Sequence, residues 1–267
     1  MVDVSVVMPC LNEEKTVGIC VEKAIKVFKE NNIDGEVIVV DNGSTDNSAE
    51  VAKKAGARVV SEERKGKGYA MQKGFSEVKG KYIIIVDSDN TSNLLEIPKF
   101  LSPLMNEGYD FVNGSRFKGQ ILPGAMPWLH QHVGNTFLTK IFNLFFHTNI
   151  SDMTSGFFGF KIDILKKIEL KTAGFDFESE IKAKIAKENL KIAEVPVNLS
   201  PREKWTKPKL NSFRDGWKHL RFMFLFAPNW LFLIPGVIFS VIGLFLIFSI
   251  LFGSLKIFWI YNLIFIR

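Results

Sequence analysis

A stretch of 23 residues without a charged side chain, Trp230–Phe252, constrains this chain more than any other feature of its sequence. A helix of about 20 apolar residues can cross the ~30 Å hydrocarbon core of a bilayer. The 229 residues before the stretch mix charged and apolar positions, as water-soluble domains do. We therefore predict a soluble domain tied to a membrane by a C-terminal spanning helix. This arrangement favours a lipid-borne substrate.

The charge next to this stretch predicts on which side of the membrane the domain lies. Between Ser200 and Arg221, seven basic residues stand against two acidic ones. Basic residues beside a spanning helix mark its cytoplasmic end and attract anionic lipid headgroups. We expect a cell-membrane protein with a cytoplasmic domain, and no signal peptide, because an apolar strand begins at Val4 with no leader before it. A nucleic-acid partner is not expected, since no groove-reading or base-stacking motif accompanies the charge.

The first half of the chain alternates short apolar runs with amphipathic segments. The runs predict strands at Val4–Met8, Glu36–Val40, Arg58–Ser61 and Tyr82–Val86. The amphipathic segments predict helices that begin at Asn12, at Ser44 (capped by Ser44 or Thr45) and at Gly68. Near-continuous apolar strands between helices indicate a parallel sheet covered on both faces. Ligands of such sheets bind beyond the carboxyl ends of the strands, where Asp41 and Asp87 are expected.

The second half is less regular. It predicts helices at Leu95–Asn106 and Glu178–Asn189, an amphipathic segment at Trp128–His147, and strands at Phe111–Asn113, Phe157–Phe160 and Ile192–Leu199. Glu178 and Glu180 are expected on a solvent-exposed helix surface, and Pro196 marks an edge strand. A basic amphipathic helix, Asn211–Phe226, is expected in the membrane interface. The predicted domains are 1–210, 211–229 and 230–267; a last apolar run, Ile257–Ile266, is too short to span, and its place stays open.

The strongest chemical signal is Asp87-Ser88-Asp89, which directly follows an apolar run. Two carboxylates separated by one residue can share Mg²⁺ or Mn²⁺ with diphosphate oxygens. The cation then offsets the charge that builds on a departing nucleoside diphosphate. The alternative is a capped turn in which one aspartate hydrogen-bonds its own backbone. We predict a metal site at Asp87 and Asp89.

Four segments surround this motif in a specific order: P-C-L-N-E-E after Met8, V-D-N-G-S-T-D from Val40, K-G-K-G from Lys65, and then D-S-D. In this combination the chain resembles family 2 glycosyltransferases of the GT-A fold, a Rossmann-like, mostly parallel α/β sheet with helices on both faces. The resemblance implies a site for a UDP- or GDP-hexose. Its residues here would be Pro9, Leu11, Asn12, Glu13, Asp41, Gly43, Ser44, Lys67, Gly68, Asp87 and Ser88.

Later segments, N-G-S-R-F from Asn113, S-D-M-T-S-G-F from Ser151 and A-E-V-P-V from Ala193, are similar to the subgroup that makes polyprenyl-phosphate sugars. The resemblance implies catalytic roles for Asp89, Arg116 and Asp152, with Asp152 orienting the acceptor site or a cationic side chain. The acceptor phosphate would be held by Arg116, His130, His132, Asn135, Arg202 and Lys209. For Arg202 and Lys209 the alternatives are contact with the other phosphate group, with lipid headgroups or with solvent alone. If the two histidines hold it, acceptor binding should weaken as pH rises above about 6.5, where free histidines lose their proton.

The leading hypothesis is inverting transfer of a hexose from a nucleoside diphosphate sugar to polyprenyl phosphate, which needs no general base because its oxygen is already anionic. A second is transfer to a hydroxyl acceptor, with Asp152 as the base. A third is a membrane-anchored relative that binds nucleotide sugar without turnover. Processive polymerisation is not expected, because only one clear span and no Q-x-x-R-W motif are present. Gly236 and Gly243 lie on one face of the predicted span and suggest a homo-oligomer.

Overall fold

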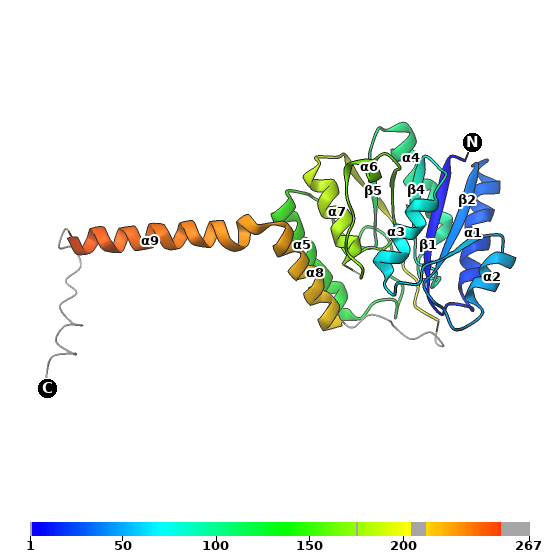
Figure 1. Ribbon diagram of the computed structural model, residues 1–267, viewed down its shortest axis with the longest axis horizontal. Coiled ribbons are helices and arrows are strands. Elements are labelled where there is room, and N and C mark those ends of the chain that lie inside the picture. The colour runs from blue at the N-terminus through cyan, green and yellow to red at the C-terminus, as the bar shows by residue number, and fades with distance from the viewer. Residues whose placement is uncertain (1, 175, 204–211, 252–267) are drawn as a thin grey trace. The chain divides into compact units, whose positions relative to one another are not determined.

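The computed structural model describes residues 2–174, 176–203 and 212–251. The chain divides into two compact units, residues 1–223 and 224–267. The first unit contains an α/β sheet with helices on both faces (Figure 1). The second contains one long apolar helix.

Seven strands of the described residues form one sheet in the order β3-β2-β1-β4-β6-β5-β7. They are β1 (Val4–Cys10), β2 (Gly35–Asp41), β3 (Arg58–Ser61), β4 (Tyr82–Ile85), β5 (Phe111–Ser115), β6 (Phe158–Lys161) and β7 (Ile192–Pro196). The neighbours among β1 to β4 are parallel, as predicted, and so are β5 and β7. Only β6 runs antiparallel, between β4 and β5. The edge position predicted for the strand with Pro196 is confirmed, since β7 is the last strand of the sheet.

The apolar core lies in two layers, one on each face of the sheet. Alternate β1 residues point to opposite layers, as strand geometry requires: Val6 and Met8 to one and Val7 to the other. The first layer receives side chains from α1 (Val17–Glu30), α2 (Ser48–Lys54) and α4 (Ile97–Asn106). The second receives them from α3 (Lys67–Glu77), α6 (Ile164–Lys167) and α7 (Phe177–Lys187). Both faces are thus covered, and the loops at the carboxyl ends of β1, β2 and β4 lie at one edge.

The predicted starts of the first two helices are wrong by several residues. Helix α1 begins at Val17, not Asn12, and has no acid in its first turn. Asn12 adopts a left-handed conformation (φ 52°), which ends regular structure at that point. Helix α2 begins at Ser48, and its N-cap is Asn47 rather than Ser44 or Thr45. At the start of α2 the Ser48 N–H donates to Asp46 Oδ1, whereas Ser44 and Thr45 bond to Asn12 in the loop after β1.

The segment predicted to be amphipathic from Trp128 to His147 forms a π-helical turn, His130–Gly134, followed by α5 (Asn135–Phe146). Leu138, Phe142 and Phe146 are buried on one side of α5. Other large apolar side chains of this segment stay exposed: Trp128, Leu129, Val133, Phe137 and Leu144. The apolar side chains of the segment are thus partly buried and partly exposed.

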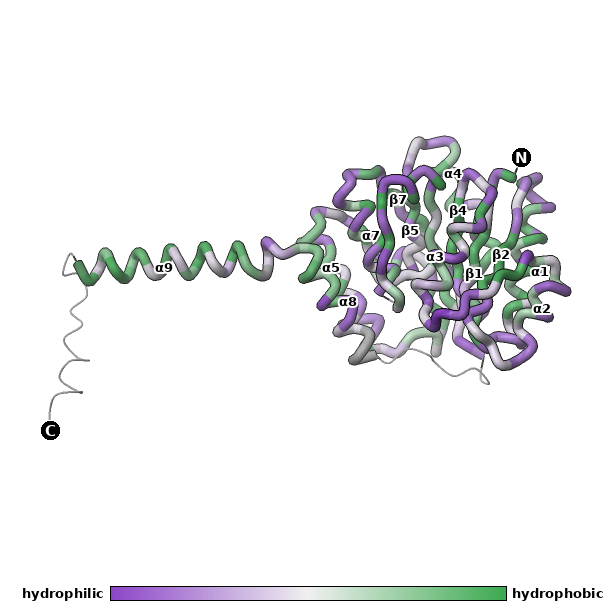
Figure 2. The backbone as a smooth tube through the Cα atoms, in the orientation of Figure 1, coloured by the Kyte–Doolittle hydropathy of each residue, from purple (hydrophilic) through white to green (hydrophobic). Residues whose placement is uncertain are grey.

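Helix α8 (Ser212–Phe226) follows, and its Trp217 is 62% exposed. In the second unit a π-helical turn, Asn229–Leu233, leads into α9 (Ile234–Leu251). Helix α9 has 18 residues, a mean hydropathy of 2.6 and no buried residue (Figure 2). Among the described helices, it alone is long and apolar enough to be a candidate membrane span. The run Ile257–Ile266 lies outside the described residues.

Candidate active site

The loops that follow β1 and β2 are bound to each other, which gathers several of the predicted nucleotide-sugar residues. Cys10 pairs with Asp41 in the sheet, so both strands end at the same edge. The Asn12 N–H donates to Ser44 Oγ (3.0 Å), and the Thr45 N–H donates to Asn12 Oδ1 (2.7 Å). The remaining predicted residues of these two loops are Leu11, Glu13 and Gly43, and Pro9 lies near the end of β1.

The loop after β4 joins this edge, because the Ser88 hydroxyl donates to the Pro9 carbonyl at 2.8 Å. The sequence did not single out Asn42, which holds the K-G-K-G loop in place. Its Nδ2 donates to the carbonyls of Glu62 and Arg64, and its Oδ1 accepts from the Gly66 N–H.

Gly68, predicted to contact the nucleotide sugar, has a structural reason to be glycine. Its N–H donates to the Ala173 carbonyl at 2.8 Å, and an added Cβ would lie 2.1 Å from the carbonyl oxygen of Thr172. Helix α3 therefore starts in direct backbone contact with residues 172–173, and a side chain at Gly68 would push them apart.

Lys67 lies between two carboxylates. Its Nζ is 2.6 Å from Asp87 Oδ1 and 2.5 Å from Glu178 Oε1, and its side chain is 9% exposed. Burial alone would lower the pKa of Lys67, but Asp87 and Glu178 outweigh it and raise that pKa. Lys67 therefore stays a cation next to the D-S-D motif.

The expectation that Glu178 and Glu180 lie on a solvent-exposed surface is wrong. Eight of the eleven residues of α7 are buried, including both glutamates. Glu178 pairs with Lys67, and Glu180 accepts hydrogen bonds from the backbone N–H groups of Lys171 and Thr172. Phe177, Ile181 and Ile185 form an apolar stripe at four-residue spacing, and the same pattern with charges between is typical of a surface helix.

Asp89, the second acid of the motif, is buried and fully engaged. One carboxylate oxygen accepts from the Thr91 N–H and hydroxyl, and the other lies 2.5 Å from Arg202 Nη2. Arg202 is 113 residues away in sequence, yet it directly faces this predicted metal ligand. The structure thus brings a predicted acceptor-site arginine to the predicted metal site.

Arg116 and Asp152 form a buried bidentate ion pair. Nε of Arg116 lies 2.6 Å from Oδ2 of Asp152, and Nη2 lies 2.7 Å from Oδ1. Asp152 is inaccessible to solvent, and Nη2 also donates to Thr154 Oγ1. Burial alone would raise the pKa of Asp152, but the Arg116 guanidinium outweighs it and holds that pKa below its usual value. Asp152 thus pairs with a cationic side chain, Arg116, and its role in the reaction stays a prediction.

Lys182 is a buried cation that the sequence did not reveal. It is 2% exposed and donates to the carbonyls of Met153 (2.7 Å) and Ser155 (2.8 Å). Burial lowers the pKa of Lys182 to about 8. The lysine holds in place the loop that carries Asp152.

Some predicted acceptor residues are not joined to this network. The ring centroids of His132 and Trp128 are 5.1 Å apart, and Asn135 Nδ2 donates to Met126 Sδ. Within residues 2–174, 176–203 and 212–251, neither His130 nor His132 hydrogen-bonds to Arg116 or Asp152. Lys209 lies outside the described residues.

The residues at the D-S-D motif fit a divalent cation. Asp87 and Asp89 supply carboxylate oxygens, the ligands that Mg²⁺ and Mn²⁺ prefer, and each already faces a cationic nitrogen. The described residues contain no cluster of three or more His, Cys, Asp or Glu side chains that could hold a metal alone. Two carboxylates with substrate phosphates completing the shell is a common arrangement for Mg²⁺.

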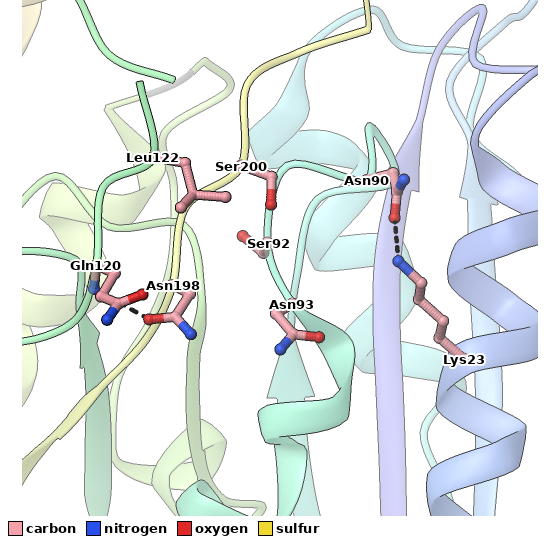
Figure 3. Close-up of a pocket in the computed structure, with 8 residues that line it drawn as sticks. All are labelled: Lys23, Asn90, Ser92, Asn93, Gln120, Leu122, Asn198 and Ser200. Atoms are coloured by element: carbon pink, nitrogen blue, oxygen red, sulfur yellow. Dashed lines mark hydrogen bonds between the residues drawn. The ribbon is translucent and has the colours of Figure 1, made fainter. Parts of the chain in front are cut away.

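A separate polar cavity of about 210 Å³ lies beside the loop that follows Asp89 (Figure 3). Lys23 donates to Asn90 on one side of it, and the Gln120 N–H donates to Asn198 on the other. Its lining shares no residue with the nucleotide-sugar, metal or acceptor sets predicted from the sequence: Lys23, Asn90, Ser92, Asn93, Gln120, Leu122, Asn198 and Ser200. We therefore do not include it in the candidate active site.

Solved structures resemble the fold closely. Glucosyl-3-phosphoglycerate synthase from Mycobacterium tuberculosis, in complex with Mn²⁺, UDP-glucose and phosphoglyceric acid, superposes with a TM-score of 0.68 at 24% identity, over 85% of this chain and 80% of that one. Its complex with Mg²⁺ and UDP gives 0.67 at 22% identity, over 85% and 79%. At this identity the likeness establishes the GT-A fold alone.

Relatives found by sequence have a higher identity to this chain than these solved structures have. The low-salt glycan biosynthesis hexosyltransferase Agl6 of Haloferax volcanii is 42% identical over 238 residues, 89% of this chain and 57% of that protein. This chain thus spans little more than half the length of Agl6. A dolichyl-phosphate hexose transferase of the same organism is 33% identical over 218 residues, 80% of this chain and 89% of that protein.

Residues 5–169, well over half of the chain, match the family described as glycosyl transferase family 2. This range holds the D-S-D motif, Lys67, Arg116 and Asp152 on the sheet edge described above. The chain belongs to glycosyl transferase family 2.

Proposed function

We propose that this chain transfers a hexose, with inversion, from a nucleoside diphosphate sugar to a polyprenyl phosphate at the cytoplasmic surface of the cell membrane. An oxygen of the lipid phosphate attacks the anomeric carbon, and a new carbon–oxygen bond forms. The bond from that carbon to the diphosphate breaks, and the nucleoside diphosphate leaves with its electron pair. No proton has to be removed, because the attacking oxygen is already anionic.

The observation that carries this proposal is that the carboxylates of the site are paired with cations. Asp152 is bound to Arg116, Glu178 to Lys67, and Asp89 to Arg202. A hydroxyl acceptor needs a general base that is free to take a proton near the working pH. Asp152 does not meet that need, because Arg116 lowers its pKa and no solvent reaches it. A phosphate acceptor needs charge neutralisation instead, which cationic side chains provide.

Each cation then has a place in the reaction. Arg116 is the first candidate for the acceptor phosphate. Its Nε and Nη2 are bound to Asp152 and Thr154, so a phosphate would be bound through Nη1. Arg202 and Lys67 lie beside the carboxylates that would face the diphosphate. A divalent cation at Asp87 and Asp89 would supply further neutralisation of the leaving group.

The membrane part of the proposal has support of its own. Helix α9 is a candidate span by length and composition. Exposed Trp128, Phe137 and Trp217 lie on two amphipathic segments of the first unit, and aromatic side chains are enriched where proteins meet the lipid headgroups. One relative is named a dolichyl-phosphate hexose transferase, which favours a lipid phosphate acceptor here.

The test is a transfer assay in membranes that contain the full chain. Labelled UDP-glucose, UDP-N-acetylglucosamine and GDP-mannose are each supplied with polyprenyl phosphate and Mg²⁺ or Mn²⁺. We expect label from one donor to enter the organic phase and to be lost in Asp89→Asn. Asp163→Asn removes an exposed acid from the start of α6 and should transfer as the wild type does.

Two results would contradict the proposal. Transfer of label to a water-soluble glycan or a neutral lipid would favour a hydroxyl acceptor. Binding of a nucleotide sugar with no transfer to any acceptor would favour a silent relative.

A further inference from the structure

Lys67 and a divalent cation would compete for the same carboxylate, that of Asp87. The Lys67 ammonium lies 2.6 Å from Asp87 Oδ1, so a cation bound by that oxygen would displace it or be repelled by it. The same ammonium lies 2.5 Å from Glu178 Oε1 on helix α7, 111 residues further along the chain. Within the described part of the chain, Lys67 pairs with these two carboxylates, of which only Asp87 belongs to the D-S-D motif.

Gly156 packs directly against this group. A Cβ added there would lie 2.9 Å from Glu178 Oε1, 3.0 Å from Asp87 Oδ2 and 3.5 Å from Lys67 Nζ. The carboxylates of Asp87 and Glu178 therefore both lie against the Gly156 backbone, where a side chain would press on them.

A buried ammonium without a counter-charge is strongly unfavourable. If Asp87 were the only partner of Lys67, a divalent cation at Asp87 would leave such an ammonium beside a second positive charge. Glu178 removes this penalty, because it is nearly as buried as Lys67 (10% and 9% exposed) and does not belong to the D-S-D pair. Lys67 can give up one carboxylate and keep the other.

We propose that Glu178 is a positioning residue that retains the Lys67 ammonium when Asp87 binds the divalent cation, so that cation and lysine act together instead of competing. The inference rests on the metal site of the proposed function and assigns to α7 a role in loading it. In this arrangement Lys67 stays next to the diphosphate as a second positive charge.

The test measures binding of Mn²⁺ to the full chain in detergent in the presence of UDP or GDP, whose phosphates complete the metal's coordination. Free Mn²⁺ is followed by electron paramagnetic resonance against the same nucleotide without protein. We expect Glu178→Gln to weaken Mn²⁺ binding by about 10- to 100-fold, as removal of outer partners of metal ligands does. Glu178→Asp keeps a carboxylate and should recover part of the affinity. Glu50→Gln removes an exposed acid from the first turn of another helix, α2, and should bind as the wild type does.

A second background separates competition from a simple loss of negative charge. In Lys67→Met no ammonium competes for Asp87, so adding Glu178→Gln should change Mn²⁺ affinity by no more than about threefold. An equal loss with and without Lys67 would overturn the inference, because Glu178 would then act through its charge alone. Thermal unfolding of every variant identifies any that fail to fold, and Glu178→Asp keeps the test available if Glu178→Gln is one of them.

The failure of the inference is distinguishable from the failure of the proposed function. Wild-type chain that binds no Mn²⁺ with either UDP or GDP would overturn the metal site, and the inference with it. Wild-type chain that binds Mn²⁺ as tightly as Glu178→Gln does would overturn the inference and leave the metal site intact.

Discussion

At the scale of single residues, the candidate site is a set of buried charges that neutralise one another. Arg116 and Asp152 show the physical reason, because each would be strongly unfavourable alone in a region that solvent does not reach. Burial alone would lower the pKa of Arg116, but Asp152 outweighs it and raises that pKa. The pair is thus charged at any physiological pH, and under the proposed function the acceptor phosphate would meet a cation that is already oriented.

We predict that Asp152→Asn lowers the free energy of unfolding by about 3–5 kcal/mol, the usual result of removing one partner of a buried ion pair. The same change should raise KM for polyprenyl phosphate more than KM for the nucleotide sugar, since Arg116 loses its orientation. Thermal unfolding and initial rates measure the two effects. A stable variant with unchanged KM values and no turnover would instead indicate that Asp152 is a general base.

Lys182 gives a prediction about pH. Burial lowers its folded-state pKa to about 8, below that of an unfolded lysine, so between about pH 8 and 10.4 the unfolded state binds more protons. The contribution of Lys182 to stability should therefore rise with pH through this window, and below pH 8 it should not vary. This contribution is measured as the difference in unfolding free energy between wild type and Lys182→Met at several pH values across the window. A difference that stays flat from pH 8 to 10 would contradict the prediction.

At the scale of elements, the start of α3 is fitted against residues 172–173 without room for a side chain. We predict that Gly68→Ala destabilises the fold by about 1–3 kcal/mol, because the Cβ would overlap the Thr172 carbonyl. Helix propensity alone would favour alanine by about 1 kcal/mol. A loss of stability in Gly68→Ala would therefore come from the overlap of its Cβ with the Thr172 carbonyl.

Gly216→Ala in α8 is the matched control, because an added Cβ there meets nothing within 4 Å. It should be neutral or stabilising in the same thermal unfolding experiment. Equal behaviour of the two alanine variants would contradict the close approach at Gly68.

At the scale of the whole molecule, the chain combines a charged α/β unit with an apolar helix that buries none of its residues in the described structure. We predict that Ile242→Lys with Leu246→Lys shifts the protein from the membrane to the soluble or degraded fraction. Each lysine near the middle of a spanning helix costs about 2.5–3.5 kcal/mol of insertion free energy. Ile242→Ala with Leu246→Ala shortens the same side chains without charge and should stay in the membrane on flotation.

The sequence by itself determined the features that repeat over a few residues. Strand positions such as Val4–Met8 follow from apolar runs between helical segments, and Asp41 and Asp87 follow from their place directly after such runs. The apolar stretch that contains α9 needs only its length and composition to be noticed. These properties are local, so they are present in the chain before it folds.

The tertiary structure alone decided which distant charges meet. Lys67 and Glu178 are 111 residues apart and Asp89 and Arg202 are 113 apart, and no periodicity connects such positions. The antiparallel strand β6 lies between β4 and β5, and helix α7 is buried. This packing brings residues of the second half of the chain, such as Glu178, to the sheet edge where β1, β2 and β4 end. Charges in a buried helix resemble surface charges until their partners are known, because only the packing of the whole sheet supplies those partners.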